Sequence, residues 1–290
     1  MTEDRKVQRT GNMHYIYLPS QWCRDKGIQE GSRVDVYPDS SGDLTVSAQR
    51  KQHSEQHLAI ELKEDDPFIL SKLVVSCFTN PVDSFEIDFI KPLNPKEILE
   101  QKKLMSTALL EVDEHRIYSD SSMTVTNPLS LFMTNVRKVK NIIQVMIEGY
   151  NKELIERFEE EIDQGKVMIY KTVIASLMHR RESRLKLVEL HYLSLLNNSI
   201  ERLTDHLITI ENPDEKTKEF LEKLRGSLSL LVEYLKKEKQ GEGITHEDAV
   251  HFVKQIRDTR MDGWAQALIA SKLQDISEVI MDWAITRKVM

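Results

Sequence analysis

The stretch NSIERLTDHLITIE, residues 198–211, decides the fold of the larger part of this chain. Its apolar residues recur at the spacing of a helix with one buried stripe, and Glu201 and Asp205 stand four residues apart among them. Side chains at positions i and i+4 lie one above the other on a single helix face. The stretch therefore predicts a bundle helix that presents two carboxylates together.

Two further segments repeat this acidic spacing. EEEIDQGK carries Glu159 and Asp163, and IRDTRMDGW carries Asp258 and Asp262. The recurrence of the pair on separate helical stretches suggests an internal repeat.

The tract from Leu129 to the end of the sequence has helical patterning throughout and no strand signals. We expect about six helices, divided into two groups of three at Asn212-Pro213. The expected breaks are near Asn151, His179 to Arg181, Asn212-Pro213, Gly241 to Gly243 and Ala270.

The N-terminal zone, residues 1–52, has the composition of a small β module. Residues 7–19 are predicted to form a strand, followed by a short helix with Ser20 as N-cap and Gly27 as C-cap. Residues 32–39 and 43–49 alternate around a Gly-bearing turn and predict a hairpin. Such a unit is too small to bury a full core and needs a partner.

Residues 58–126 alternate between strand and helix signals and predict a small α/β connecting segment. Its predicted strands lie in 58–63, 84–92, 108–119 and 123–127, and its predicted helices in 66–78 and 94–105. A linker domain and an effector site are both compatible with this segment. The expected fold class is α+β, with an all-α region over 127–290 in repeats of about 127–212 and 213–290.

Charge is distributed unevenly along the chain. The formal net charge is −7, which argues against a protein that coats nucleic acid along its whole length. Residues 1–52 hold eight Lys/Arg and seven Asp/Glu, so any DNA contact is expected there. Two cysteines are too few for a disulfide framework, and no apolar stretch approaches the roughly 18–20 residues of a membrane span. We expect a soluble cytoplasmic protein.

Acidic pairs on facing helices have a definite chemical consequence. Four carboxylates brought together repel one another unless a cation lies between them. An all-oxygen ligand set suits Mg, Mn or ferric Fe better than Zn, although the sequence does not identify the metal. The alternative is that each pair lies on a solvated helix face, where such spacing is common.

The run Ile200 to His206, IERLTDH, resembles the ERIGDH-type signature of the PhoU family. The resemblance covers roughly residues 129–290 and implies two tandem three-helix bundles, surface metal clusters and regulation of phosphate uptake. It also implies which acidic residues bind metal, with Gln274 and Glu278 aligned to the fourth pair. The implied metal ligands are Glu159, Asp163, Glu201, Asp205, Asp258, Asp262 and Glu278. Since Gln274 offers only a neutral oxygen, the second site is expected to bind metal more weakly or to be vacant.

The N-terminal zone resembles the AbrB/MazE swapped-hairpin module, in the variant that precedes archaeal PhoU domains. Gly11, Leu18-Pro19, Gly27-Ile28, Gly31 and the strand Val34 to Val36 carry the likeness. It implies a homodimer with interlocked hairpins. Two copies of the basic residues would then form a cationic face for DNA phosphates, and these residues are Arg5, Lys6, Arg9 and Arg24. The segment from Gly11 to Pro19 is longer than in AbrB, and Cys23 replaces one expected basic residue.

The leading hypothesis is a dimeric, non-enzymatic regulator that binds DNA through the N-terminal zone and metal through the bundle. No Gly-rich phosphate loop, nucleophile elbow or catalytic triad is present in the sequence. The alternative is an adaptor that does not bind DNA and docks on a phosphate transporter or signalling partner. A carboxylate-bridged metalloenzyme is disfavoured, because the spacing lacks the Glu-x-x-His pairs of di-iron bundles.

Overall fold

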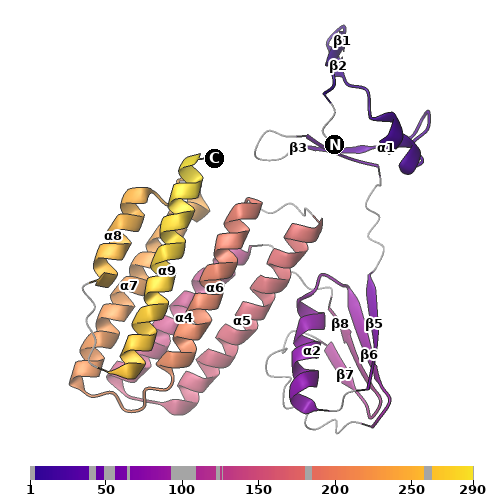
Figure 1. Cartoon of the computed structure of the whole chain (residues 1–290). Coiled ribbons are helices and arrows are strands. Elements are labelled where there is room, and N and C mark those ends of the chain that lie inside the picture. The colour runs from indigo at the N-terminus through magenta and orange to yellow at the C-terminus, as the bar shows by residue number, and fades with distance from the viewer. Residues whose placement is uncertain are drawn as a thin grey trace. The chain divides into compact units, whose positions relative to one another are not determined.

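The computed structural model gives the chain a mixed α+β fold (Figure 1). It describes residues 4–38, 44–48, 56–63, 66–92, 109–121, 125, 127–179, 185–257 and 263–289. The chain divides into two compact units, Met1–Ser54 and Glu55–Met290. Among the described residues, no helix combines the length and apolar character that a membrane crossing requires.

The N-terminal unit consists of two antiparallel hairpins and one short helix. Its elements are β1 (Gln8–Thr10), β2 (Met13–Tyr15), α1 (Ser20–Asp25), β3 (Asp35–Pro38) and β4 (Leu44–Ser47). The prediction of a single strand over 7–19 is wrong, because Gly11 takes a φ of 59° and turns the chain between β1 and β2. The hairpin of β3 and β4 is confirmed.

The N-cap of helix α1 lies one residue earlier than expected. Pro19 occupies the N-cap position, so the prediction of Ser20 as the cap is wrong. Gly27 follows the C-cap with a φ of 65°, and the Ile28 amide donates to the Cys23 carbonyl at 2.8 Å. The C-cap itself is Lys26, so the prediction of Gly27 as the cap is wrong by one residue, and the chain leaves the helix through this left-handed glycine.

No described residue of the N-terminal unit is buried. Several of its apolar side chains are more than 40% exposed, namely Val7, Met13, Tyr15, Ile16, Tyr17, Val36, Tyr37 and Leu44. Apolar area left in water contributes nothing to folding. The unit, taken alone, therefore lacks a core.

The second unit starts with a small α/β segment. Its elements are β5 (His57–Leu62), α2 (Pro67–Thr79), β6 (Ser84–Phe89), β7 (Leu109–Val112) and β8 (Arg116–Asp120), with strand order β5-β6-β8-β7. Asp66 caps α2 by accepting from the Phe68 amide at 2.8 Å. The alternating inward side chains of the sheet, such as Phe85 and Ile87, form one core with Phe78 of α2. The predicted helix at 94–105 and most of the predicted strand at 123–127 lie outside the described residues.

Six helices make up the described part of residues 127–289, in agreement with the number expected. They are α4 (Pro128–Glu148), α5 (Lys152–His179), α6 (Leu187–Leu207), α7 (Glu215–Gln240), α8 (His246–Arg257) and α9 (Trp264–Val289). Each packs on its neighbours in the cyclic order α5-α4-α7-α8-α9-α6 around one continuous apolar core (Figure 1). The expected break near Ala270 is wrong, because α9 runs unbroken from Trp264.

Helix α5 belongs to both parts of the second unit. Val167 and Met168 pack into the core of the α/β segment, and Lys171 is almost completely buried. The Lys171 Nζ donates to the Phe78 carbonyl at 2.9 Å, the Asn80 carbonyl at 3.3 Å and the Ser121 Oγ at 3.2 Å. This side chain satisfies carbonyls at the end of α2 and fastens the α/β segment to the bundle.

Candidate carboxylate site on α5 and α6

Helices α4, α5 and α6 approach closely where the acidic pairs lie. Gly165 faces the side chain of Asn135 on α4 so tightly that an added Cβ would clash with the amide. Asn135 Nδ2 donates to the Ile162 carbonyl at 3.3 Å, and Asn197 Nδ2 on α6 donates to the Lys166 carbonyl at 3.1 Å. Two buried amides therefore fix the position of α5 between its neighbours.

The structure brings together the four acidic residues predicted on these two helices, which we call the carboxylate patch: Glu159, Asp163, Glu201 and Asp205. Burial raises the pKa of Asp163 to about 7, and repulsion by Glu159, Glu201 and Asp205 adds to the shift. The pKa of Glu159 is also raised, first by burial and then by Asp205 and other carboxylates. Partial desolvation and the nearby Glu201 raise the pKa of Asp205.

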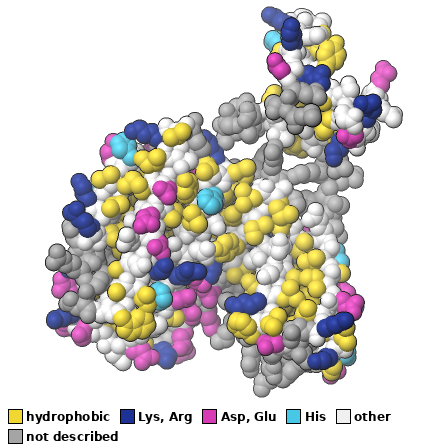
Figure 2. All heavy atoms as spheres, in the orientation of Figure 1, with side chains coloured by type: hydrophobic (Ala, Val, Ile, Leu, Met, Phe, Trp, Pro, Cys, Tyr) yellow, Lys and Arg dark blue, Asp and Glu magenta, His cyan; other side chains and the backbone are white. Residues whose placement is uncertain are grey.

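Acidic side chains outside the four add to the negative potential of this region. Glu160 and Glu156 contribute to the raised pKa of Glu159. Figure 2 shows Asp and Glu side chains gathered at the lower edge of the bundle, in the region of α5. The patch is thus a place where a cation would relieve repulsion.

One cation of the protein already lies in the patch. Lys166, on α5, donates through its Nζ to Glu201 Oε1 across the interface with α6. Both side chains are largely buried, at 23% and 17% exposed. Lys166 also lowers the pKa of Asp163 and of Asp205 and so offsets part of the repulsion.

The patch does not hold its carboxylates in coordination geometry. Within the part of the chain that the structure describes, no three His, Cys, Asp or Glu side chains are grouped so that they could hold a metal ion. A metal bound here would need the side chains to converge further and Lys166 to release Glu201. The donor set itself, four carboxylates and no thiolate or imidazole, suits a hard cation.

The second predicted metal site is described only in part. Asp258 and Asp262 lie outside the described residues. On α9, Gln274 Nε2 donates to Glu278 Oε1 at 3.3 Å, and both side chains are exposed. The aligned glutamine therefore pairs with Glu278 on one helix face.

The four basic residues predicted to contact DNA are all exposed on the N-terminal unit. Arg9 Nε donates to the Gly11 carbonyl at 2.7 Å, and Arg24 donates to Gln21 Oε1 at 2.9 Å. Both contacts are local, and each uses only part of the five donors of a guanidinium group.

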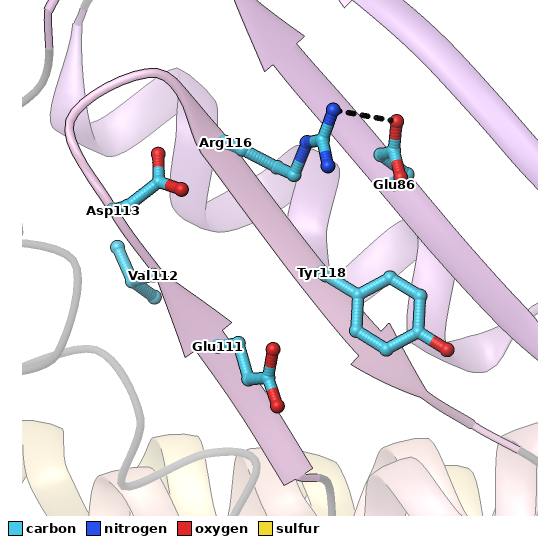
Figure 3. Close-up of a pocket in the computed structure, with 6 residues that line it drawn as sticks. All are labelled: Glu86, Glu111, Val112, Asp113, Arg116 and Tyr118. Atoms are coloured by element: carbon cyan, nitrogen blue, oxygen red, sulfur yellow. Dashed lines mark ion pairs between the residues drawn. The ribbon is translucent and has the colours of Figure 1, made fainter.

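A shallow polar hollow lies on the open face of the α/β sheet (Figure 3). Its volume is about 500 Å³, and Arg116, Glu86, Glu111, Asp113, Val112 and Tyr118 line it. Arg116 pairs with Asp88 at 3.0 Å and with Glu86 at 3.4 Å. The one cation of the lining is thus engaged by carboxylates of the neighbouring strand.

Comparison of the chain with protein-family models, curated proteins and solved structures gives no match. The function of the chain is therefore inferred from its own residues and from the resemblance of its motifs to those of known families.

Sequence reasoning did not identify Lys166, Asn135 or Gly165 as parts of the site. A signal for Lys166 existed, because it follows Asp163 by three residues and so lies on the same helix face. Its contact with Glu201 depends on how α5 is rotated against α6, which the spacing of residues within one helix does not determine.

Proposed function

We propose that this chain is a regulator of phosphate uptake whose helical bundle binds a multivalent cation at the carboxylate patch. The observation that carries the proposal is the gathering of four carboxylates from α5 and α6, with Asp163 at a pKa of about 7. Burial, the larger cause of this shift, and repulsion both disfavour the charged carboxylate, and a bound cation would compensate for both. The likeness of residues 200–206 to the PhoU signature supports phosphate uptake as the regulated process.

The residues that would hold the cation are Glu159, Asp163, Glu201 and Asp205. Mg²⁺, Mn²⁺ or ferric iron fits this all-oxygen donor set. The bound ion would supply positive charge and take over the role that Lys166 has toward Glu201. Binding is therefore coupled to the release of Lys166 and to a change at the α5–α6 interface.

The N-terminal unit is proposed to form a homodimer that binds DNA. Its exposed apolar side chains and lack of buried residues support a second copy as the missing half of the core. Arg5, Lys6, Arg9 and Arg24 are exposed on the same unit, and a dimer doubles their charge. Phosphate contacts by such side chains are sequence-independent and salt-sensitive.

Fluorescence anisotropy with promoter DNA of phosphate-transport genes tests the regulator. The full chain is titrated over a salt series, with and without Mn²⁺. We expect binding that weakens as salt rises and that changes by about threefold or more on addition of Mn²⁺. The Asp163→Asn variant should still bind DNA and should lose the response to Mn²⁺.

A matched control separates the DNA contacts from general charge. Arg9→Gln with Arg24→Gln should reduce binding and the salt slope, whereas Lys223→Gln on α7 should change neither. Absence of salt-dependent DNA binding at physiological ionic strength would leave the chain as a cation-responsive adaptor and defeat the DNA half of the proposal.

A further inference from the structure

A second charged surface is a row of basic side chains along the seam between α4 and α7. Arg137 and Lys140 come from α4, and Arg225 and Lys236 come from α7; we call these four residues the cation row. The other three residues lie within electrostatic reach of Lys140, since burial and then Arg225, Arg137 and Lys236 lower the pKa of its ammonium group.

The four positions form a line because of the directions in which the two helices run. Arg225 Nη1 donates to Gln144 Oε1, which places the middle of α7 beside the C-terminal end of α4. With Lys236 also near Lys140, α7 must run antiparallel to α4. Arg225 and Lys236 are eleven residues apart, so the row extends about 16 Å along the helix axis.

The cation row is poorly neutralised by the protein itself. Arg225 NH2 contacts Glu222 Oε2 at 2.8 Å. Neither Arg137, Lys140 nor Lys236 has a carboxylate within ion-pair distance among the residues that the structure describes. In a chain with a formal net charge of −7, three cations that have no ion pair within the described part of the chain and lie along one seam indicate a site for an anion.

The surroundings of the row distinguish between kinds of anion. None of the large apolar side chains on the described residues of α4 and α7 is exposed. A protein interface normally centres on apolar or aromatic anchors, which this seam does not offer. A single orthophosphate would engage only part of a row of this length. An extended, highly charged and non-protein anion fits both observations.

We propose that the α4–α7 seam binds a linear oligophosphate anion through Arg137, Lys140, Arg225 and Lys236. The guanidinium groups offer paired donors to phosphate oxygens, and the lysines add mobile positive charge. The row shares no residue with the carboxylate patch. A result that excludes the proposed cation site would therefore leave the anion site unaffected, and the reverse also holds.

Isothermal titration of the full chain with inorganic tripolyphosphate tests the site. EDTA is included so that no metal bridges the anion to the carboxylate patch. Tripolyphosphate is expected to bind at least tenfold more tightly than orthophosphate, with affinity that falls as salt rises. Arg137→Gln and Lys236→Gln, both at exposed positions, should each weaken binding about threefold to tenfold.

Lys223→Gln provides the matched control, because it removes a lysine from α7 that pairs with Glu219 and lies two residues from Arg225, on another face. It should leave the affinity unchanged. Circular dichroism of each variant confirms the helical fold. The proposal is overturned if tripolyphosphate does not bind, if poly-glutamate of equal charge binds as tightly, or if the control weakens binding as much as the two row variants.

Discussion

The Lys166 side chain donates a hydrogen bond to the Glu201 carboxylate across the interface of α5 and α6. This contact joins the two helices where the four carboxylates of the patch lie within electrostatic reach of one another. It gives the protein an internal cation at the place where an external one is proposed to bind. The two cations therefore compete for one carboxylate.

Replacing Lys166 with glutamine should separate stability from cation binding. Without metal, the Lys166→Gln variant should lose about 1–2 kcal/mol of unfolding free energy, because Glu201 loses its partner and the patch loses a partly buried counter-charge. With the competing ammonium removed, Mn²⁺ should bind about tenfold more tightly. Chemical denaturation and calorimetric titration measure the two effects.

Lys152→Gln is the control for this variant, since Lys152 is exposed and pairs with Glu211 at 3.5 Å. It should change both quantities little. Weaker rather than tighter Mn²⁺ binding by the Lys166 variant would mean that Lys166 assists the ion and does not compete with it.

Asp163 should make the stability of the metal-free protein depend on pH. Its pKa in the folded chain is about 7, above its ordinary value of 3.8. Because the folded state holds this proton more tightly than the unfolded chain, the stability contributed by Asp163 falls as pH rises from about 4 to about 7. The Asp163→Asn variant should therefore be more stable at pH 8, by about 1–2 kcal/mol or a few degrees in Tm, and nearly unchanged below pH 4.

Thermal unfolding in EDTA at several pH values checks this prediction. An asparagine variant that melts lower than the unchanged protein at pH 8 would show that the Asp163 carboxylate stabilises the metal-free fold, contrary to the repulsion inferred for the patch.

Two helical glycines should respond to alanine in opposite ways. Gly165→Ala should destabilise the protein by about 2 kcal/mol or more, because the new methyl group clashes with the buried amide of Asn135. Gly226→Ala meets open space on α7 and should stabilise by up to about 1 kcal/mol. Equal gains from both variants, measured by thermal unfolding, would contradict the close approach of α4 and α5.

Lys171→Met should loosen the attachment of the α/β segment to the bundle. The variant keeps the apolar stem but leaves the Phe78 and Asn80 carbonyls without their donor, at a cost of about 2–4 kcal/mol. Lys223→Met, on an exposed face, should be nearly neutral. Hydrogen exchange localises the effect, which is expected in α2 and the adjoining part of α5; protection unchanged in both would contradict a fastening role.

The long helices could be predicted because their signals are local. Asn212 takes a φ of 46° and Gly241 a φ of 85°, so the breaks at Asn212-Pro213 and Gly241 follow from residue type. The error at Ala270 has a physical origin as well. In the sequence of α9, apolar residues fall on most sides of the helix and do not form a single stripe. Gly263, directly before the helix, is a stronger signal for a break than Ala270.

The acidic residues of the site could also be predicted from their spacing. Glu159 and Asp163, like Glu201 and Asp205, are separated by about one turn of a single helix. What spacing could not provide is the rotation of α5 against α6 and α4. That rotation is set by Gly165 against Asn135 and by Asn197 on the Lys166 carbonyl, contacts between residues 30 or more positions apart in the sequence. In the N-terminal unit, Gly11 divides an apparently continuous strand, because a left-handed glycine turn and a strand glycine look alike in sequence.

Metal content is the most direct measurement of the central claim. The protein is stripped with EDTA, dialysed against Mn²⁺ at pH 8 and analysed for metal per chain, in parallel with Asp163→Asn, Glu201→Gln and Glu153→Gln, the last an exposed acid in the first turn of α5. We predict stoichiometric Mn²⁺ in the unchanged protein and in Glu153→Gln, with clear loss in the two patch variants and in all samples as pH falls through about 7. Equal metal content in all four proteins would show that the carboxylate patch does not bind the ion.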